Sequence, residues 1–316
     1  MSTKLSIIIV NWNTLDLLRQ CLRSVIGALG ELLSEIIVVD NASSDGSPEM
    51  VNKEFPSVRL VENTSNLGFA KANNQGLSIA HGEYALLLNS DTIIEDCRLF
   101  TEWIAFMDQH PEAGASGCRL VFPCGAYQVG DAGFQPSLLT AVNFSMFLSK
   151  LFPRYCRGLF LQDECPGLPL DVDWVSGADF LVRKSILSQT GMLDESIFMY
   201  AEDIEWGCRI RKYGYRIYYL PHLQIVHLQG ASSVKDRTLN SYSVTWLRNI
   251  RNLYLHLEPG ASVSLFDAVL FLGYVLRTGL YFGLYLKTGE ARYERRAQQM
   301  FQYAAFFIKR DLLGGP

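Results

Sequence analysis

Short apolar runs alternate with helix-patterned segments along the first part of the chain. The β-branched or aliphatic runs 5–10, 36–39, 58–61 and 84–88 predict buried strands. Apolar residues at helical spacing follow Thr14, which we expect to cap a helix. Further helices are predicted over 45–55, 68–80 and 98–110. A strand near 113–121 continues the alternation. The pattern favours parallel βαβ units with helices on both faces of one sheet.

The pattern weakens between residues 122 and 169, where glycine, proline and aromatic residues mix without a clear period. We expect a long loop region there, and long loops within compact domains are often functional. Strands are predicted again at 171–175, 180–182, 215–220 and 224–227, with a short helix after Lys184 and another that begins at Glu202 and Asp203.

The last third of the chain predicts three helices, over 241–257, 262–286 and 292–310. The second is strongly apolar but contains Asp267 and Arg277, and a spanning helix would place Arg277 in hydrocarbon at considerable cost. With the basic cluster Arg292, Arg295 and Arg296, the pattern favours amphipathic helices that lie on an anionic membrane surface. The alternative is an ordinary helical subdomain or a dimer interface, because amphipathicity does not distinguish lipid from protein.

Composition narrows the function classes. The 316 residues carry a net charge of −4, so no global basic field attracts nucleic acid. Seven scattered cysteines without a C-x-x-C pair favour reduced thiols in a cytosolic compartment. The first apolar run is too short for a signal-peptide core, and we expect it to be a strand. No G-x-G-x-x-G follows it and no P-loop motif occurs, which argues against a dinucleotide site and excludes a P-loop enzyme.

Polar clusters follow several of the apolar, strand-like runs. They are Asp40-Asn41, Asn89-Ser90-Asp91, Glu202-Asp203 and His227. Ligands of α/β sheets bind outside the carboxyl ends of the strands, so we expect these side chains to gather at one edge. Carboxylates and a histidine there would form a site for a hard metal ion and a general base.

Each cluster also has a simple structural explanation. The turn at Asp91 could bind a cation that bridges a diphosphate, or could be an ordinary turn or cap. Asp40 could accept from a nucleobase or a ribose, or cap the next helix. His227 could be a metal ligand or a structural histidine.

Glu202 and Asp203 could supply a general base, or could stabilise the positive end of a helix dipole. Adjacent helical residues point about 100° apart, so only one of the two acids can face a cleft directly. Asp203 shares a helix face with Trp206 and Ile210, which should pack inward, whereas Glu202 aligns with Glu205 and Arg209.

Seven ordered segments together resemble glycosyltransferase family 2, in the branch of bacterial rhamnosyltransferases and galactofuranosyltransferases. The likeness covers residues 4–230, and the order of the segments makes it specific. The segments are IIIVNWNT, IIVVDNASSDGS, NLGFAKANNQGL, YALLLNSDT, WVSGADFLVRKSIL, GMLDESIFMYAEDIEWGCRIRKYGY and HLQG.

The resemblance implies a GT-A fold, which is a Rossmann-like, mostly parallel sheet with helices on both faces. It implies an inverting transfer from a nucleoside-diphosphate sugar with Mn²⁺ or Mg²⁺, in which Asp203 is the catalytic base. Asp91 and His227 correspond to metal ligands. The donor nucleotide and its phosphates would lie along Asn11, Asp40, Asn66, Gly68, Lys71, Asn89 and Ser90. The donor sugar and the acceptor would border Trp174, Gly177, Ala178, Asp179 and Glu202.

The chain departs from the family pattern at one position. Asn89 occupies the first acidic position of the D-x-D motif, so a metal ion there would lose one negative charge but keep a carbonyl oxygen. Two other interpretations remain. A sugar-phosphate nucleotidyltransferase would carry a glycine-rich G-x-G-T-R stretch where this chain has NWNTLDL. A carbohydrate-binding module without catalysis would have no need of Asp91, Asp203 and His227.

The expected organisation is a glycosyltransferase domain over 1–236 and a helical, membrane-associated region over 237–316. The first comprises a nucleotide-sugar half, 1–121, and an acceptor half, 122–236. We expect a cytoplasmic enzyme at the inner face of the cell membrane, acting in cell-surface polysaccharide synthesis. From the family likeness alone, the expected donor is thymidine-diphosphate-L-rhamnose and the expected acceptor a lipid-linked saccharide. A homo-oligomer is compatible with this expectation.

Overall fold

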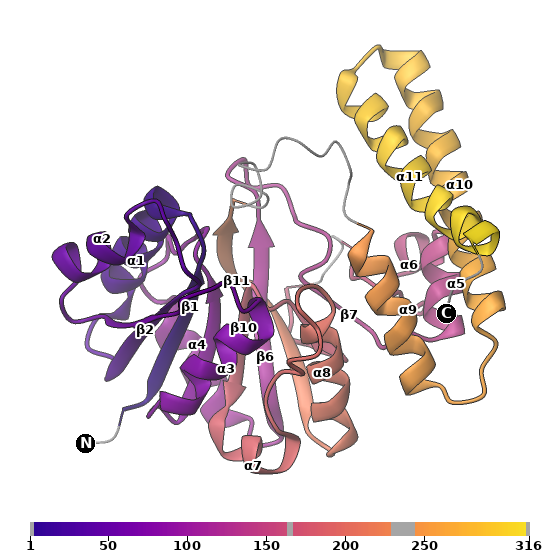
Figure 1. Ribbon diagram of the computed structural model, residues 1–316. Helices are drawn as coiled ribbons and strands as arrows, with labels where there is room; N and C mark the ends of the chain where they lie inside the picture. Colours follow the sequence, from indigo (N-terminus) through magenta and orange to yellow (C-terminus); the bar gives the residue numbers. More distant parts are fainter. Residues whose placement is uncertain (1–2, 163–166, 229–243, 314–316) are drawn as a thin grey trace. The chain divides into compact units, whose positions relative to one another are not determined.

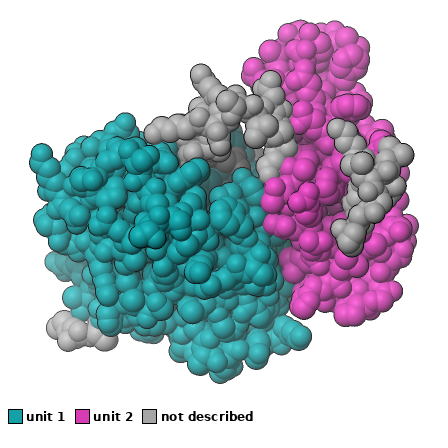
Figure 2. Space-filling model, in the orientation of Figure 1, with its two compact units in different colours: residues 1–133, 163–237 teal, residues 134–162, 238–316 magenta. Residues whose placement is uncertain are grey.

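The computed structural model describes residues 3–162, 167–228 and 244–313, with the side chains of the last helix described as far as Ile308. The chain forms two compact units, which are coloured separately in Figure 2. Unit 1 comprises residues 1–133 and 163–237, and unit 2 comprises residues 134–162 and 238–316. Residues 134–162 therefore group with the C-terminal helices, whereas the sequence had placed them in the acceptor half.

Unit 1 is built on a nine-stranded mixed sheet within the described residues, in the order β3-β2-β1-β4-β10-β6-β11-β5, with β8 beside β11 (Figure 1). Its strands are β1 (Leu5–Asn11), β2 (Ser34–Asp40), β3 (Arg59–Glu62), β4 (Tyr84–Asn89), β5 (Thr92–Ile93), β6 (Ala113–Val121), β8 (Leu170–Val172), β10 (Asp179–Arg183) and β11 (Arg216–His227). A small second sheet pairs β7 (Ala132–Gly133) with β9 (Trp174–Val175).

The part of the sheet formed by β1–β4 is parallel, because β1 pairs in parallel with both β2 and β4, and β2 with β3. Strand β10 is inserted antiparallel between β4 and β6, while β6 and β11 are again parallel. The predicted mostly parallel α/β sheet is thus confirmed. The helices of unit 1 are α1 (Leu15–Leu29), α2 (Ser47–Glu54), α3 (Phe69–Ile79), α4 (Leu99–Gln109), η1 (Lys184–Ile186), α7 (Leu187–Thr190) and α8 (Glu202–Lys212).

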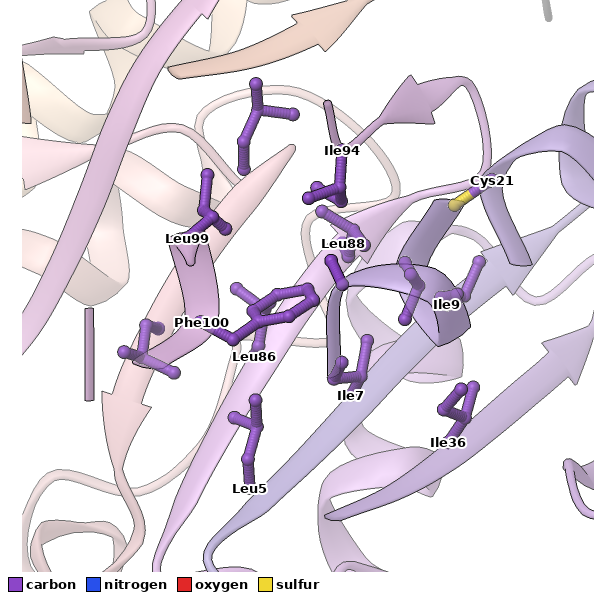
Figure 3. Close-up of a cluster of buried hydrophobic side chains, with 14 of the residues drawn as sticks. Leu5, Ile7, Ile9, Cys21, Ile36, Leu86, Leu88, Ile94, Leu99 and Phe100 are labelled. Carbon is purple, nitrogen blue, oxygen red and sulfur yellow. The ribbon is translucent and has the colours of Figure 1, made fainter. Parts of the chain in front are cut away.

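Alternation along the central strands buries both faces of this sheet. Leu5, Ile7 and Ile9 of β1 lie on one face and share a core with Cys21 of α1 and Phe100 of α4 (Figure 3). Ile8 points to the opposite face, where a Cβ atom added to Gly76 of α3 would lie 2.4 Å from its Cγ2. A continuous β-branched run is what a strand buried on both faces requires.

Unit 2 is helical. It contains α5 (Leu138–Ser145), α6 (Leu148–Leu151), α9 (Thr245–Leu257), α10 (Val263–Thr288) and α11 (Ala291–Leu313). The expected loop at 122–169 is therefore wrong for 138–151. Helix α5 begins at a capping box made by Ser137 and Thr140, and Trp246 of α9 packs edge-on against Phe160 and Tyr274. The predicted start of α9 at 241–243 lies outside the described residues.

Arg277 does not face outward from α10. Its guanidinium stacks over the rings of Phe144 and Phe147, 4.1 and 4.2 Å from their centroids, and donates to the carbonyl oxygens of Phe144 and Ser145 at the end of α5. Among the described residues, α10 is the one helix long and apolar enough to cross a membrane. The guanidinium of Arg277, whose charge argued against a membrane-spanning helix, is therefore in contact with protein groups of unit 2.

Two local expectations need correction. Thr14 is the N-cap residue of α1, as expected, but its hydroxyl bonds to Asn11 and Ser90, and Asp45 accepts the N–H of Leu15 instead. Residues 215–220 and 224–227 are parts of one strand, β11, whose register with β6 shifts between Leu220 and Gln224. Pro221 lies in that shift, where a strand tolerates a residue without an N–H donor.

Candidate active site

The carboxyl ends of β1, β2 and β4 bring three polar residues into register. Asn11 pairs with Asp40, and Asn89 pairs with Val10 beside it. Asn11 donates to the Asp40 carboxylate at 2.7 Å, and Thr14 links Asn11 to Ser90 by contacts of 2.6 and 2.9 Å. One buried polar network therefore crosses three strand ends, as the sequence predicts for this edge.

Within this network Asp40 is 1% exposed, and both of its oxygens accept hydrogen bonds from protein groups. One oxygen accepts from Asn11 and the other from the backbone N–H of Ser43 at 2.8 Å. In this structure Asp40 holds the loop after β2, and a nucleobase would reach its carboxylate only after displacing part of that network.

Gly68 leads into α3 in a conformation that only glycine adopts easily. Its φ is +84°, and an added Cβ would lie 2.7 Å from the Phe198 ring. Asn66 accepts the N–H of Gly68 at 2.9 Å, and Asn41 donates to the Gly68 carbonyl at 3.2 Å. The eleven-residue helix α3 begins directly after this turn, with Lys71 exposed in its first turn. A helix N-terminus beside a lysine favours an anion such as a diphosphate.

Asp91 and His227 lie together at the ends of neighbouring strands. The Nε2 atom of His227 is 3.2 Å from the Asp91 carboxylate and 3.3 Å from the side-chain nitrogen of Asn89. Two ligands bound at right angles about 2.1 Å from one cation would be about 3 Å apart, so this spacing fits a shared divalent ion.

The described residues contain no group of three or more His, Cys, Asp or Glu side chains that could hold a metal ion. The two side chains, with Asn89 beside them, would leave most positions of an octahedral cation open to diphosphate oxygens or water. The donor set therefore fits a cation that is held jointly with a nucleotide.

The two adjacent acids of α8 have different surroundings. Asp203 is partly exposed, and its oxygens accept the backbone N–H groups of Gly177 at 2.9 Å and Ile204 at 2.8 Å. Glu202 is buried, and its Oε2 has no hydrogen-bond partner. Glu202 therefore does not point outward beside Glu205 and Arg209, as its helical position suggested, although Trp206 and Ile210 are buried as expected.

Burial raises the pKa of Asp203 above its usual range, opposed by the bonds from Gly177 and Ile204. Burial, together with the charge of Asp203, raises the pKa of Glu202 to about 8. Glu202 therefore keeps its proton near neutral pH, and the two backbone N–H donors favour the charged form of Asp203.

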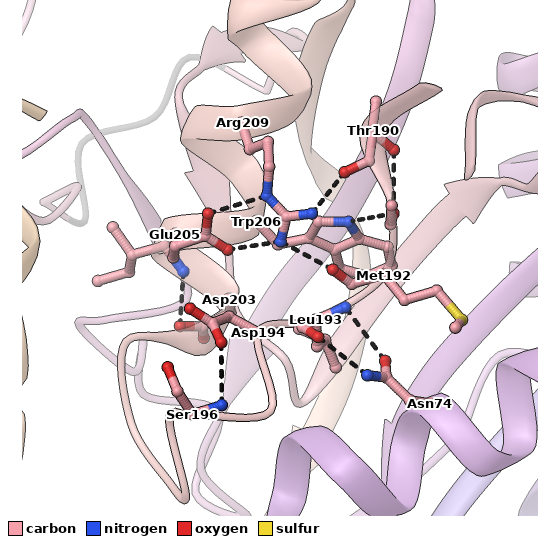
Figure 4. Close-up of polar contacts among 12 residues, drawn as sticks. Asn74, Thr190, Met192, Leu193, Asp194, Ser196, Asp203, Glu205, Trp206 and Arg209 are labelled. Atoms are coloured by element: carbon pink, nitrogen blue, oxygen red, sulfur yellow. Dashed lines mark hydrogen bonds and ion pairs between the residues drawn. The ribbon is translucent and has the colours of Figure 1, made fainter. Parts of the chain in front are cut away.

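The loop before these acids is held at several points (Figure 4). Arg209 donates to the carbonyl oxygens of Thr190 and Met192 and pairs with Glu205 at 2.6 Å. Asn74 of α3 bonds to both the N–H and the carbonyl of Leu193. The loop ends at Tyr200 and Ala201, which both have positive φ values of about 70°. Such strain persists where the surrounding structure imposes it, often at functional sites.

Two residues expected to border the substrates are inside the protein. Trp174 is 2% exposed and packs against Gly207, and Asp179 has no exposed surface. Asp179 accepts the N–H of Cys118 at 2.6 Å, and burial raises its pKa well above the usual range. Their side chains therefore pack inside the protein behind the site and do not line its surface. Gly177 and Ala178 reach it through their backbones.

Two buried polar residues escaped the sequence analysis. Gln128 contacts His227, and Asp131 accepts from Tyr127 and Tyr219. Burial raises the pKa of Asp131 to about 7. Both lie in the segment without periodicity after residue 121, where no local pattern marks a buried side chain.

Comparison with known proteins identifies the architecture. Residues 6–156 match the model of Glycosyl transferase family 2. The N-acetylglucosaminyl-diphospho-decaprenol L-rhamnosyltransferase of Mycobacterium tuberculosis is 29% identical over 222 residues, which cover 64% of this chain and 68% of that protein. The O-antigen biosynthesis protein RfbC of Myxococcus xanthus is 27% identical over 74% of this chain, but that match covers 18% of RfbC.

Solved structures share the fold at low sequence identity. The mannosyltransferase PcManGT of Pyrobaculum calidifontis, in complex with GDP-Man and Mn²⁺, has a TM-score of 0.56 at 18% identity and covers 100% of this chain and 89% of its own. GalNAc-T7 with UDP, GalNAc and Mn²⁺ has a TM-score of 0.54 at 14% identity and covers 80% of this chain and 54% of its own. The predicted GT-A fold and the family resemblance are confirmed.

Proposed function

Because this chain is a glycosyltransferase of family 2, we propose that it transfers a sugar, with inversion and with a divalent cation, from a nucleoside-diphosphate donor to a lipid-linked saccharide. The donor we propose is thymidine-diphosphate-L-rhamnose, and the product a cell-surface polysaccharide precursor. The name of the mycobacterial relative supports both the sugar and the lipid-linked acceptor. The Mn²⁺ in the complexes of two proteins of the same fold, PcManGT and GalNAc-T7, supports the cation.

One observation carries the proposal. The dipeptide Gly177-Ala178 joins the turn of the candidate metal site to the candidate base by two hydrogen bonds. The carbonyl of Ala178 accepts the N–H of Asn89 at 3.0 Å, and the N–H of Gly177 donates to Asp203 at 2.9 Å. An added Cβ at Gly177 would lie 2.9 Å from the Phe69 ring at the start of α3. The metal, phosphate and base elements are therefore tied to one short segment.

The chemistry follows from this arrangement. A divalent cation, when bound, neutralises charge on the departing diphosphate. Asp203 accepts the proton of an acceptor hydroxyl at its carboxylate, while that hydroxyl oxygen attacks the anomeric carbon from the face opposite the diphosphate. Glu202 keeps its proton near neutral pH, so it adds no second charge beside the base. Inversion results because attack and departure occur in one in-line step.

Unit 2 supplies the proposed contact with the membrane. One face of α10 exposes apolar residues and carries no charge between Ala268 and Leu286. The exposed apolar side chains of this helix are Leu265, Leu272, Val275, Leu276, Leu280, Phe282 and Leu286. The exposed Arg292, Arg295 and Arg296 follow at the start of α11. An apolar face followed by basic residues suits the surface of an anionic leaflet, and we place the enzyme on the cytoplasmic side of the cell membrane.

A nucleotide-sugar screen tests the function. Purified protein is incubated with thymidine-, uridine- and guanosine-diphosphate sugars, with and without a polyprenyl-diphosphate saccharide, in Mn²⁺, Mg²⁺ or chelator. We expect nucleoside-diphosphate release that requires both acceptor and metal and is fastest with the rhamnose donor. Release that chelator leaves unchanged contradicts metal dependence. An absence of acceptor-dependent release from all donors favours the non-catalytic carbohydrate-binding alternative.

A further inference from the structure

Gln128 is a buried residue outside the motifs of the family resemblance, and it is fixed in place from several sides. It is 3% exposed and lies between β6 and β7, where its backbone N–H donates to the Leu120 carbonyl at 3.0 Å. The segment around it is tied down by Asp131, which accepts from the hydroxyls of Tyr127 and Tyr219. The side chain of Gln128 therefore meets β11 in a defined position.

The contacts of the Gln128 amide determine the tautomer of His227. The Nε2 group of Gln128 donates to the main-chain carbonyl of His227, and a carbonyl can only accept. The amide oxygen is then the atom that lies 3.0 Å from Nδ1 of the His227 ring. Since that oxygen also can only accept, Nδ1 must carry a proton.

The other ring nitrogen faces the candidate metal site. Nε2 of His227 is 3.3 Å from the side-chain nitrogen of Asn89 and 3.2 Å from the Asp91 carboxylate. The Asn89 amide can donate to Nε2, whereas the carboxylate can accept a proton from it, so it is the contact with Gln128 that assigns a proton to Nδ1. With Nδ1 protonated, Nε2 is the ring nitrogen that can bind a divalent cation beside Asp91.

We propose that Gln128 is the positioning residue of this site. It holds His227 as the Nδ1–H tautomer and so presents Nε2, together with Asp91, to the divalent cation of the donor complex. The role in metal binding rests on the function proposed above, whereas the tautomer is a property of the metal-free protein. Partners of this kind typically change metal affinity by about 10–100-fold when they are removed.

The test combines a spectroscopic and a binding measurement on the full chain. Histidine ¹⁵N NMR of the metal-free protein, with the His227→Gln spectrum for assignment, reports which ring nitrogen carries the proton. Electron paramagnetic resonance of free Mn²⁺ measures its affinity with thymidine or uridine diphosphate present. The variants are Gln128→Leu, Gln128→Glu and, as a matched control, Gln189→Leu on exposed α7.

We expect Nδ1–H in the wild type, a changed tautomer ratio in Gln128→Leu and Mn²⁺ affinity about 10–100-fold lower in that variant. Gln128→Glu keeps an acceptor against Nδ1 but loses the N–H that donates to the His227 carbonyl, so it should retain the proton on Nδ1 and bind Mn²⁺ more tightly than Gln128→Leu. Gln189→Leu should match the wild type.

The positioning role is overturned if the His227 ring of the wild type carries its proton on Nε2 and none on Nδ1. It is also overturned if a folded Gln128→Leu variant binds Mn²⁺ with wild-type affinity. Either result leaves the proposed function in place. A wild type that binds no Mn²⁺ with any nucleoside diphosphate overturns the metal-dependent function and the role of Gln128 with it. If Gln128→Leu does not fold, the position of the His227 ring proton in the wild type and in Gln128→Glu still tests the positioning role.

Discussion

The two units of the chain place polar and apolar side chains in opposite ways. In unit 1, Asp40, Asp91 and Asp179 are buried at or beside strand ends, and Glu202 is buried at the start of α8. On α10 of unit 2, a row of leucines with a phenylalanine is exposed while Arg277 is enclosed by α5. Burying polar groups and exposing apolar ones both cost free energy, so each arrangement indicates something other than folding.

The difference suggests that the two units have different functions. Asp203, with two backbone N–H donors, is preorganised as a proton acceptor, and Asp91 beside His227 is placed to bind a cation. An exposed apolar face with a basic end suits a partner that is itself apolar and anionic. If this is correct, changes at the polar edge should abolish chemistry without changing membrane binding, and changes on α10 should do the reverse.

The largest expected effect is at Asp91. Asp91→Ala removes a carboxylate ligand, and Asp91→Asn removes its charge while keeping its shape, so each should lower turnover by more than about 10³-fold. Nucleotide binding in the presence of Mn²⁺ should weaken, whereas vesicle binding should not change. The matched control is Asp96→Asn, which changes an exposed acid five residues after Asp91 and should keep wild-type turnover. Full activity of Asp91→Ala would exclude the metal assignment.

The second effect distinguishes the two acids of α8. Asp203→Asn keeps the shape but removes the proton acceptor, so the rate should fall by roughly 10²–10⁴ while donor affinity changes little. Glu202→Gln replaces a group that is already uncharged near neutral pH, so it should cost much less. Single-turnover rates and donor titrations separate chemistry from binding. The opposite ranking would exchange the two roles, and normal rates in both variants would place the base elsewhere.

The third effect belongs to unit 2. Leu276 and Leu280 are about half exposed, so each could bury apolar area worth about 1 kcal/mol in a membrane. The double variant Leu276→Gln/Leu280→Gln should therefore bind vesicles of anionic phosphatidylglycerol about 30-fold more weakly. Nucleotide-sugar hydrolysis in solution should not change.

The matched control for this variant is Ile26→Gln/Leu33→Gln, which replaces two similarly exposed residues of unit 1. Sedimentation with vesicles measures the effect. Equal loss in both variants would remove the distinction between the units, and resistance of the wild type to carbonate extraction would indicate a spanning segment instead.

The sequence predicted the two regions unequally well. Strands β1, β2 and β4 were predicted within about two residues, because a buried parallel strand is a continuous aliphatic run that ends at polar residues. The two-residue strand β5 was not predicted. Helix α5 was missed because it is short and buries Thr140, Asn143 and Ser145, so it shows no amphipathic pattern. Its burial also depends on α10, more than a hundred residues later. Local periodicity does not contain such contacts.

The same reason explains which site residues could be found. Asp40 and His227 end strands, and Asp91 lies in the turn between β4 and β5, so their positions follow from the sheet. Gln128 lies in a segment with no regular pattern, and its role follows only from its contacts with His227. The orientations of Glu202 and Trp174 depend on packing around the two left-handed residues at 200–201 and on β9, neither of which the sequence pattern marks.

The fourth effect is a pH dependence confined to unit 1. Burial raises the pKa of Asp131 from 3.8 to about 7, so between these values the folded protein holds a proton that the unfolded chain releases. The contribution is therefore fully favourable below about pH 4 and is lost as the pH rises towards 7, with a slope of at most about 1.4 kcal/mol per pH unit. Asp131→Asn should flatten the urea-unfolding free energy over this window.

Glu202→Gln provides the matched comparison, because its folded pKa of about 8 places the corresponding loss between about pH 4.5 and 8. The absolute stability of either variant is less informative, since each substitution also changes hydrogen bonds. A slope that neither variant alters would mean that these acids ionise normally in the folded protein.

The smallest effects come from replacing a glycine by alanine on each of the two faces of α10. A Cβ at Gly273 would lie 2.6 Å from Cβ of Ser145 in α5, whereas a Cβ at Gly283 would meet nothing within 4 Å. Gly273→Ala should therefore destabilise unit 2 by about 1–3 kcal/mol through overpacking. Gly283→Ala should stabilise it by up to about 1 kcal/mol, because alanine is the better helix former. Urea unfolding followed by Trp246 fluorescence, with the other tryptophans replaced by phenylalanine, measures both. Equal destabilisation by the two variants would mean that the apolar face of α10 is covered by protein, and the case for a lipid-facing surface would fail.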